Sequence, residues 1–331
     1  MSDTPEKLLN RRSFLSSAAT VAVGGAATTS LVLPAKADTP IVGAQLPNVY
    51  RRKLGNYEIT VLGDGYLDLP HQIWAGLSPE QIDGYLDDAF VPTGSLRNGV
   101  NAYLINTGEK LILVDSGARD LFGPNAGLLP GNLAAIGVSP EDIDEVLITH
   151  VHPDHVAGLY TADGRITVPN AEILVDEADL NFWISEAGQA QAIDIAKPWF
   201  DIARDWKNVY DGRIRTFRGE TDFGDGISSF PLPGHTPGHT GLRIESAGET
   251  LLILGDAVIS AAVQFANPDA SAIWDTNAEE GKKSRRTIFD VAARDRTLVT
   301  ATHLPFPSFG YVDRRADGSY RWVPEEWRYA T

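Results

Sequence analysis

The chain has 331 residues, of which 43% are hydrophobic and 22% are charged, and its formal net charge is −16. This composition is typical of a globular protein with a large core. The sequence contains no cysteine, which excludes disulfides, thiolate zinc ligands and a cysteine nucleophile.

The first 37 residues resemble a bacterial twin-arginine signal peptide. Arg11 and Arg12 precede a weakly apolar stretch at residues 18–33, which ends in the small-x-small run at residues 35–37. An ordinary signal peptide or a single membrane anchor is the alternative. The stretch is short for a membrane span and diluted by Gly and Thr, so no stable span is expected. We therefore expect export by the twin-arginine route to the periplasm or the exterior.

The charge outside this segment is strongly acidic. Residues 1–37 carry a net charge of +2, which leaves −18 on the remainder of the chain. Such a surface repels phosphate backbones, so nucleic acid is not expected as a partner. The basic run at residues 282–286 is expected to lie on a solvated helix face.

Residues 38–56 are expected to be a lead-in segment, and residues 57–331 to form one catalytic domain. The pattern predicts two β-rich halves with helices between them, and therefore two sheets stacked inside helical layers. The first half has expected strands at 57–62, 102–105, 111–114, 145–149 and 171–175, a helix at 131–136, and a mostly helical stretch at 176–206 broken at Pro198. The second half has expected strands at 241–245, 250–254 and 298–302, and a helix at 279–293.

The segment at residues 149–155 concentrates side chains that bind metals. It holds His150, His152, Asp154 and His155 directly after an apolar strand, in a chain with only seven histidines. Imidazole and carboxylate together suit divalent first-row metals. Four such ligands from one loop can serve two adjacent metals.

Three further candidate ligands follow apolar runs in the second half. They are His235, Asp256 and His303. Each alone is a weak signal, because an aspartate after a strand is often only a helix cap. Together with the first four they make seven ligands, which complete two metal sites if one carboxylate bridges the metals.

This ligand order resembles that of the metallo-β-lactamase superfamily, over roughly residues 57–310. The resemblance implies a four-layer αβ/βα sandwich and two divalent metal ions, most often zinc, with manganese, iron or cobalt also accepted. It also implies that Asp256 bridges the metals and that Asp115 orients a ligand, or else forms a turn. By the same resemblance, His150, His152 and His235 would hold one metal, and Asp154, His155 and His303 the other.

Within that superfamily, four segments resemble the methyl parathion hydrolase-like branch, whose members are dinuclear phosphotriesterases. The segments are residues 121–124, 181–183, 261–265 and 303–307. The resemblance implies that Phe122, Trp183 and Phe200 line a pocket for an aromatic leaving group. For each of the three, ordinary core packing is the alternative.

The implied chemistry is attack by a metal-bridging hydroxide on an electrophilic carbonyl or phosphoryl centre, with Asp154 or Asp256 as a possible proton carrier. The expected substrates are small molecules, namely aryl phosphotriesters, aryl esters or aryl lactones. The alternatives are an acyl-homoserine lactonase or another lactonase, a glyoxalase II-like thioesterase, and a non-catalytic metal-binding protein. A homodimer is common among the relatives.

Overall fold

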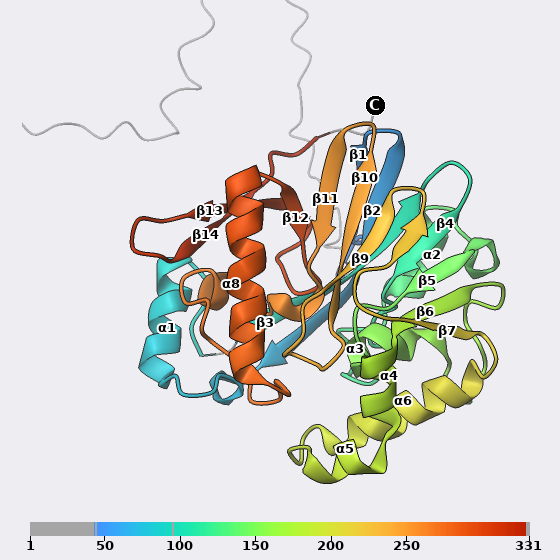
Figure 1. Cartoon of the computed structure of the whole chain (residues 1–331), viewed down its shortest axis with the longest axis horizontal. Coiled ribbons are helices and arrows are strands. Elements are labelled where there is room, and N and C mark those ends of the chain that lie inside the picture. Colours follow the sequence, from blue (N-terminus) through green and yellow to red (C-terminus); the bar gives the residue numbers. More distant parts are fainter. Residues whose placement is uncertain (1–42, 44, 95, 329–331) are drawn as a thin grey trace, which may run out of the picture. The chain divides into compact units, whose positions relative to one another are not determined.

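The computed structural model describes residues 43, 45–94 and 96–328. The segment interpreted as a signal peptide therefore lies outside the described residues. A compact unit begins at Leu46 and holds every helix and strand named below (Figure 1). Among the described residues, no helix is both long and apolar enough to cross a membrane.

The first sheet contains seven strands in chain order within the described part of the chain. Strands β1 to β4 pair antiparallel, and β4 to β7 pair parallel. The strands are β1 (Val49–Leu54), β2 (Tyr57–Leu69), β3 (Leu96–Asn106), β4 (Leu111–Val114), β5 (Glu145–Leu147), β6 (Glu172–Asp176) and β7 (Ile214–Phe217).

Strand β1 corrects the boundary expected at residue 57. It pairs with β2 from Val49 opposite Leu62 to Leu54 opposite Tyr57, so the folded unit begins inside the lead-in segment. The strand is hard to recognise from the sequence, because residues 51–53 at its centre are all basic. One of these basic residues, Arg52, is buried and forms a two-bond ion pair with Glu325 near the C-terminus.

The second sheet also has seven strands among the described residues, and only β11 and β12 pair in parallel. From one edge to the other the order is β14 (Tyr320–Pro324), β13 (Gly310–Arg314), β12 (Leu298–Thr300), β11 (Glu249–Ile253), β10 (Thr240–Ser246), β9 (Ile227–Pro231) and β8 (Asp222–Gly224).

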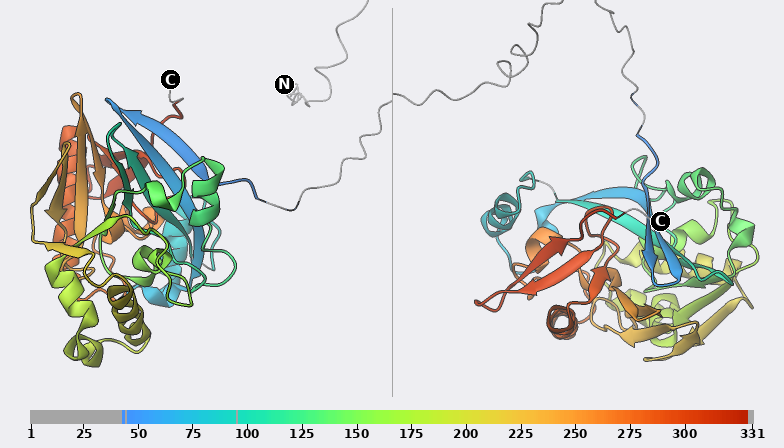
Figure 2. Two further views of the ribbon diagram at one scale, coloured as in Figure 1. Left: turned by 90° about the vertical axis from the view of Figure 1, so that its right-hand side faces the viewer. Right: turned by 90° about the horizontal axis from the view of Figure 1, so that it is seen from above.

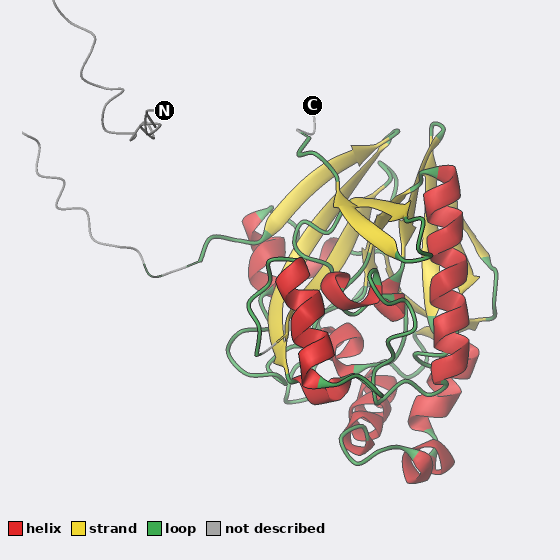
Figure 3. Cartoon of the chain, turned by 90° about the vertical axis from the view of Figure 1, so that its left-hand side faces the viewer, coloured by secondary structure: helices red, strands yellow, loops and turns green. Residues whose placement is uncertain are grey.

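Helices cover the outer faces of both sheets (Figures 2 and 3). An apolar core lies between the sheets, where Ile105 and Ile112 meet Leu242 and Ile253. Separate apolar clusters join each sheet to its helices. The predicted four-layer αβ/βα sandwich is therefore confirmed. The first sheet carries α2 (Leu129–Ala135), α3 (Pro153–Val156), α4 (Glu177–Ile184), α5 (Glu186–Gln191) and α6 (Lys197–Val209). In the second half, α7 (Ala261–Gln264) packs with α1 (Pro79–Asp88) from the first half, and α8 (Ala278–Asp295) packs on the second sheet.

Helix α6 begins one residue before Pro198, where a break was expected. Pro198 lies in its first turn, where the missing N–H has no intrahelical partner to lose. Helix α8 begins after Asn277, whose side chain accepts a hydrogen bond from Glu280 N. Both helices therefore start where local chemistry favours a first turn.

Asp64 clamps the loop that follows β4. Its buried carboxylate accepts backbone hydrogen bonds from Ala118, Gly127 and Leu129, at 2.8, 3.1 and 2.8 Å. Gly117 leaves room for this approach, because a Cβ there would lie 2.3 Å from the Asp64 carboxyl carbon. Burial raises the pKa of Asp64 from 3.8 to about 6, although the three N–H groups oppose the shift.

This raised pKa predicts a pH-dependent stability difference between the native protein and Asp64→Asn. The folded state holds the Asp64 proton more tightly than the unfolded state, so this contribution is complete below pH 3.8 and is lost as pH rises through about 6. Two pH units correspond to about 3 kcal/mol. Urea unfolding at pH 4 and pH 7 should show native stability falling by about that amount relative to the variant. A pH-independent difference would mean that Asp64 is already ionised at pH 4.

Candidate metal centre

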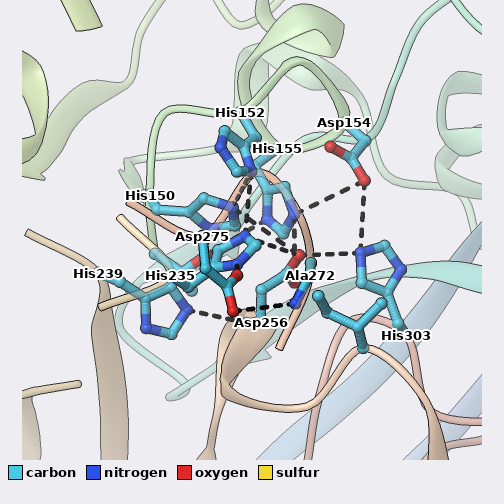
Figure 4. A network of polar contacts seen from close by, with 12 residues as sticks. His150, His152, Asp154, His155, His235, His239, Asp256, Ala272, Asp275 and His303 are labelled. Atoms are coloured by element: carbon cyan, nitrogen blue, oxygen red, sulfur yellow. Dashed lines mark hydrogen bonds and ion pairs between the residues drawn. The ribbon is translucent and has the colours of Figure 1, made fainter. Parts of the chain in front are cut away.

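The seven predicted ligands meet at one rim of the two sheets (Figure 4). The loop after β5 and the short helix α3 supply four of them. His235 follows β9, Asp256 follows β11, and His303 follows β12. All seven side chains are buried, so the rim forms a closed polar cluster rather than a solvated surface.

The first group contains three imidazoles that converge on one point, together with Asp256. His152 Nδ1 lies 2.9 Å from His150 Nε2 and 3.1 Å from His235 Nε2. Nitrogen ligands bound tetrahedrally to zinc at about 2.0–2.1 Å lie roughly 3.3 Å apart. The spacing of the three nitrogens therefore fits a shared small cation.

The second group contains Asp154, His155 and His303. His303 Nε2 lies 3.4 Å from Asp154 Oδ2, and His155 Nε2 lies 3.8 Å from the same oxygen. Asp256 reaches this group as well, with its oxygens 3.0 Å from His303 Nε2 and 3.4 Å from His155 Nε2. Because Asp256 Oδ2 is also 3.5 Å from His235 Nε2, one carboxylate stands between both groups.

Asp115 and Thr149 orient two of the histidines. The Asp115 carboxylate accepts hydrogen bonds from Thr149 N, from the Thr149 hydroxyl and from His155 Nδ1, at 2.8–2.9 Å. Since the Thr149 hydroxyl proton points to Asp115, its oxygen can accept a hydrogen bond from His150 Nδ1 at 3.1 Å. The outer nitrogens of both rings then carry the protons, which leaves the inner Nε2 atoms free to bind a metal.

Two further acceptors hold His235 and His303 in the same tautomer, with Nε2 free to bind a metal. Asp275 accepts from His235 Nδ1 at 2.7 Å and is itself held by Ala272 N at 3.0 Å. The carbonyl of Gly99 accepts from His303 Nδ1 at 2.7 Å. Asp275 lies in no recognisable motif, and its part in the site becomes visible only in the fold.

His239 and Asp179 join the ligand-bearing loops without belonging to either group. His239 donates to Leu232 O from Nδ1 at 3.1 Å, so its Nε2 accepts the backbone N–H of Asp256 at 2.8 Å. Burial lowers the pKa of His239 to about 3, which keeps this acceptor neutral. Asp179 accepts from Val151 N and Gly238 N, and burial raises its pKa to about 6. The two residues fix the spacing between the ligand loops.

The surroundings of the first ligand group favour the neutral forms of His150 and His152. Burial, reinforced by neighbouring imidazoles, holds the pKa values of His150 and His152 well below their ordinary value. Burial also opposes the charged forms of His155 and His303, but the neighbouring carboxylates, Asp256 foremost, together outweigh it and raise both pKa values. Burial disfavours the ionised Asp256 too, yet these two histidines hold its pKa well below the usual range. The bridging position is therefore anionic.

Two buried atoms at the centre test whether the residues fit a metal. His155 Nε2 and Asp256 Oδ1 have no hydrogen-bond partner within the described residues. Buried polar atoms without a hydrogen-bond partner are costly, and a cation held between this nitrogen and this oxygen would satisfy both. The donor set thus fits a dinuclear metal site, with four ligands in one group, three in the other and one carboxylate between them.

Arg285 departs from the solvated helix face expected for residues 282–286, whereas Lys283 is exposed as expected. It is buried on α8, and its guanidinium donates to the carbonyls of Ala257, Pro268 and Ala270 at 2.6, 2.8 and 2.9 Å. Burial lowers its pKa to about 10. The arginine ties the peptide after Asp256 to the loop that leads to Asp275.

The predicted aromatic pocket is only partly supported. Phe122 is 39% exposed, on the loop that Asp64 clamps. Trp183 and Phe200 are 1% and 0% exposed and pack within the core, with tilted rings whose centroids are 4.6 Å apart. Their packing against the first sheet leaves almost no surface for a substrate, so core packing describes these two rings.

Two other tryptophans lie nearer the surface beside the centre. Trp199 on α6 and Trp274 are partly exposed, and their ring centroids are 5.9 Å apart. Trp199 also contacts His152 at 4.8 Å, edge to face. These rings offer the aromatic surface that the sequence assigned to Trp183.

Comparison with known proteins gives the lineage of this arrangement. The family model for the metallo-beta-lactamase superfamily matches residues 96–303, a span that contains all seven ligands. The chain belongs to the metallo-beta-lactamase superfamily. The family resemblance and the fold expected from it are confirmed, and the chain is a metal-dependent hydrolase of this superfamily.

Solved structures of superfamily members share the fold over most of the chain. Hydrolase AbOPH is 30% identical, with a TM-score of 0.80, and covers 86% of this chain and all of its own. The dizinc quorum-quenching lactonase AidC is 26% identical, with a TM-score of 0.81, and covers 86% of this chain and 99% of its own. An N-acyl homoserine lactonase from Bacillus sp is 25% identical over 239 residues, 66% of this chain and 86% of that protein. The methyl parathion hydrolase-like branch stays a prediction.

Proposed function

We propose that the protein is a dinuclear lactonase that opens the ring of N-acyl homoserine lactones. The observation that carries this proposal is the Asp256 carboxylate between two buried ligand groups. The similarity of the chain to a dizinc lactonase and to N-acyl homoserine lactonases also supports the proposal. These relatives support the lactonase alternative more strongly than the phosphotriesterase expected first.

The proposed metals are two zinc ions, because the donors are only imidazole and carboxylate. His150, His152 and His235 would hold one, Asp154, His155 and His303 the other, and Asp256 both. Bound there, the ions would supply Lewis acidity towards the lactone carbonyl and acidify water.

The chain's own residues would orient the reactants and carry the proton. Asp154 is the most exposed of the seven ligands, so its carboxylate is best placed to accept a proton and pass it to the leaving alkoxide. Asp115, Asp275 and the carbonyl of Gly99 keep the histidines in one tautomer.

A substrate panel tests the proposed function. The zinc-loaded enzyme should show kcat/KM for N-hexanoyl and N-decanoyl homoserine lactone at least about tenfold above that for methyl paraoxon and an aryl ester, as expected of a site selected for lactones. Chelation should abolish all of these activities together, and zinc should restore them. A phosphotriester preferred over every lactone would reject the lactonase and restore the first expectation.

Aryl esters and aryl phosphotriesters form the second candidate class. The observation in their favour is the partly exposed Trp199–Trp274 pair beside His152, which suits flat leaving groups. The same panel decides between the two classes. A glyoxalase II-like thioesterase or a non-catalytic metal-binding protein would be indicated by thioester turnover alone or by no turnover at all.

We further propose that the enzyme acts outside the cytoplasm, on small molecules rather than nucleic acid. The supporting observations are the Arg11-Arg12 pair and the charge of −16 on the whole chain. Replacing both arginines by lysine should hold the precursor in the cytoplasm, as measured by fractionation and immunoblotting. Unchanged export that depends on the general secretory route would contradict twin-arginine targeting. Homodimer formation stays a prediction, to be measured by light scattering.

A further inference from the structure

The surface beside the metal centre is hollowed. A cavity of about 730 Å³ lies between α1, the start of β3, α7 and the β13–β14 hairpin. His303, a member of the second ligand group, forms part of its wall. The cavity therefore adjoins the second ligand group of the metal centre. Its apolar wall includes Val91, Leu96, Ala262, Phe265, Pro305 and Trp322.

The size and lining of this cavity suit an elongated apolar group. Its volume falls within the range of about 300–1,000 Å³ common for small-molecule sites. The apolar part of the wall favours hydrocarbon, and each methylene buried there strengthens binding about three- to fourfold. The rest of the wall is polar and includes Asp88, Arg97, Arg315 and Arg321.

One polar side chain in the wall is left without a partner. Asn98 on β3 is only 2% exposed, yet its side-chain Nδ2 makes no hydrogen bond within the described residues. Buried amides are almost always hydrogen-bonded, to protein, to ordered water or to a ligand. The residue next in the chain, Gly99, accepts the His303 Nδ1 hydrogen bond, so Asn98 lies where the cavity meets the metal centre.

An exposed aromatic ring lies at the edge of the cavity. Phe90, directly after α1, is 97% exposed and has a left-handed backbone with φ of 56°. An isolated phenyl ring in this conformation gains little from its own fold. It adds apolar surface that only a long ligand could reach.

We propose that this cavity receives the acyl chain of an N-acyl homoserine lactone, with the Asn98 amide hydrogen-bonded to the amide group of the substrate. The inference rests on the proposed lactonase function and adds a specificity to it. The lactone ring lies at the metals, the amide lies beside Asn98, and the chain extends over Val91 and Trp322, which are both partly exposed. The enzyme accordingly prefers medium and long acyl chains over short ones.

The test is a chain-length series with one substitution that fills the cavity. Ala266 lines the cavity and is exposed, so Ala266→Trp adds bulk there without entering the core. Ala134→Trp, on the exposed face of α2 and outside the cavity, is the matched control. The measurement is kcat/KM of the zinc-loaded enzymes for homoserine lactones with acyl chains from butanoyl to decanoyl.

The native enzyme and Ala134→Trp should favour decanoyl over butanoyl at least about 30-fold, a modest part of what six buried methylenes allow. Ala266→Trp should reduce this ratio to about threefold or less, as expected of a filled cavity. Lactone hydrolysis without chain-length dependence, or a ratio unchanged in Ala266→Trp, would overturn the cavity assignment and leave the lactonase intact. No lactone hydrolysis by the enzyme with two zinc ions would overturn the lactonase itself.

A second variant separates the hydrogen bond from the apolar contacts. Asn98→Leu keeps the volume and removes the amide. It should raise KM for N-decanoyl homoserine lactone about tenfold, the value of one buried hydrogen bond, and change KM for an alkyl lactone without an amide less than twofold. Equal changes for both substrates, or no change for either, would show that Asn98 does not bind the substrate amide.

Discussion

Asp256→Ala should abolish turnover and lower the metal content below two ions per chain. The carboxylate stands between both ligand groups, 3.0 Å from His303 Nε2 and 3.5 Å from His235 Nε2, so its removal weakens two sites at once. Loss of a partner that only orients a ligand costs about 10–100-fold, and loss of a shared ligand should exceed about 1,000-fold in kcat. Elemental analysis and lactonase kinetics measure the two effects.

Two further variants serve as comparisons for Asp256→Ala. Asp115→Asn disturbs the partner of His155 without removing a ligand, and it should lower activity by about 10–100-fold. Asp317→Ala, in an exposed turn, should change neither quantity. A fully active native enzyme with one metal per chain would reject the dinuclear centre, whatever the variants do.

Trp183→Ala should lower the free energy of unfolding by about 3–5 kcal/mol, as large aromatic truncations in cores do. The indole is buried and contacts Phe182, Phe200 and His152, with ring centroids 4.6–5.2 Å apart. Denaturant unfolding of the zinc-loaded protein gives the measurement.

Trp199→Ala is the matched comparison for the same measurement. This ring is partly exposed, so its loss should cost less than about 2 kcal/mol, while KM for aryl substrates rises. If Trp183→Ala instead proved stable and raised KM alone, Trp183 would line the substrate pocket as the sequence resemblance implies.

The ligand positions were predictable because they depend on local chemistry. Imidazoles and carboxylates directly after apolar strands, as at His150 and His303, mark strand ends that gather at one rim of a sheet. Paired apolar runs around short turns predicted the β3–β4 and β10–β11 hairpins in the same way, and the structure confirms both. The two stacked sheets follow from these elements.

Other features were not predictable, because distant contacts determine them. Asp275 and Arg285 acquire their partners only when the loop after α7 folds over the second sheet. The basic residues of β1 do not show the pattern of a strand. The burial of Arg52 depends on its ion pair with Glu325, which is distant in the sequence. Trp183 was assigned to a pocket by resemblance, although local sequence cannot tell a core ring from a neighbouring rim ring such as Trp199.

The division of the ligands between the two sheets has a consequence for maturation. Four follow β5 in the first sheet, and three follow β9, β11 and β12 in the second. Neither half alone brings Asp256 to His155, so a chain with undocked sheets cannot assemble the shared position. Both ligand groups take members from the two sheets, so neither metal site is complete before the sheets have docked.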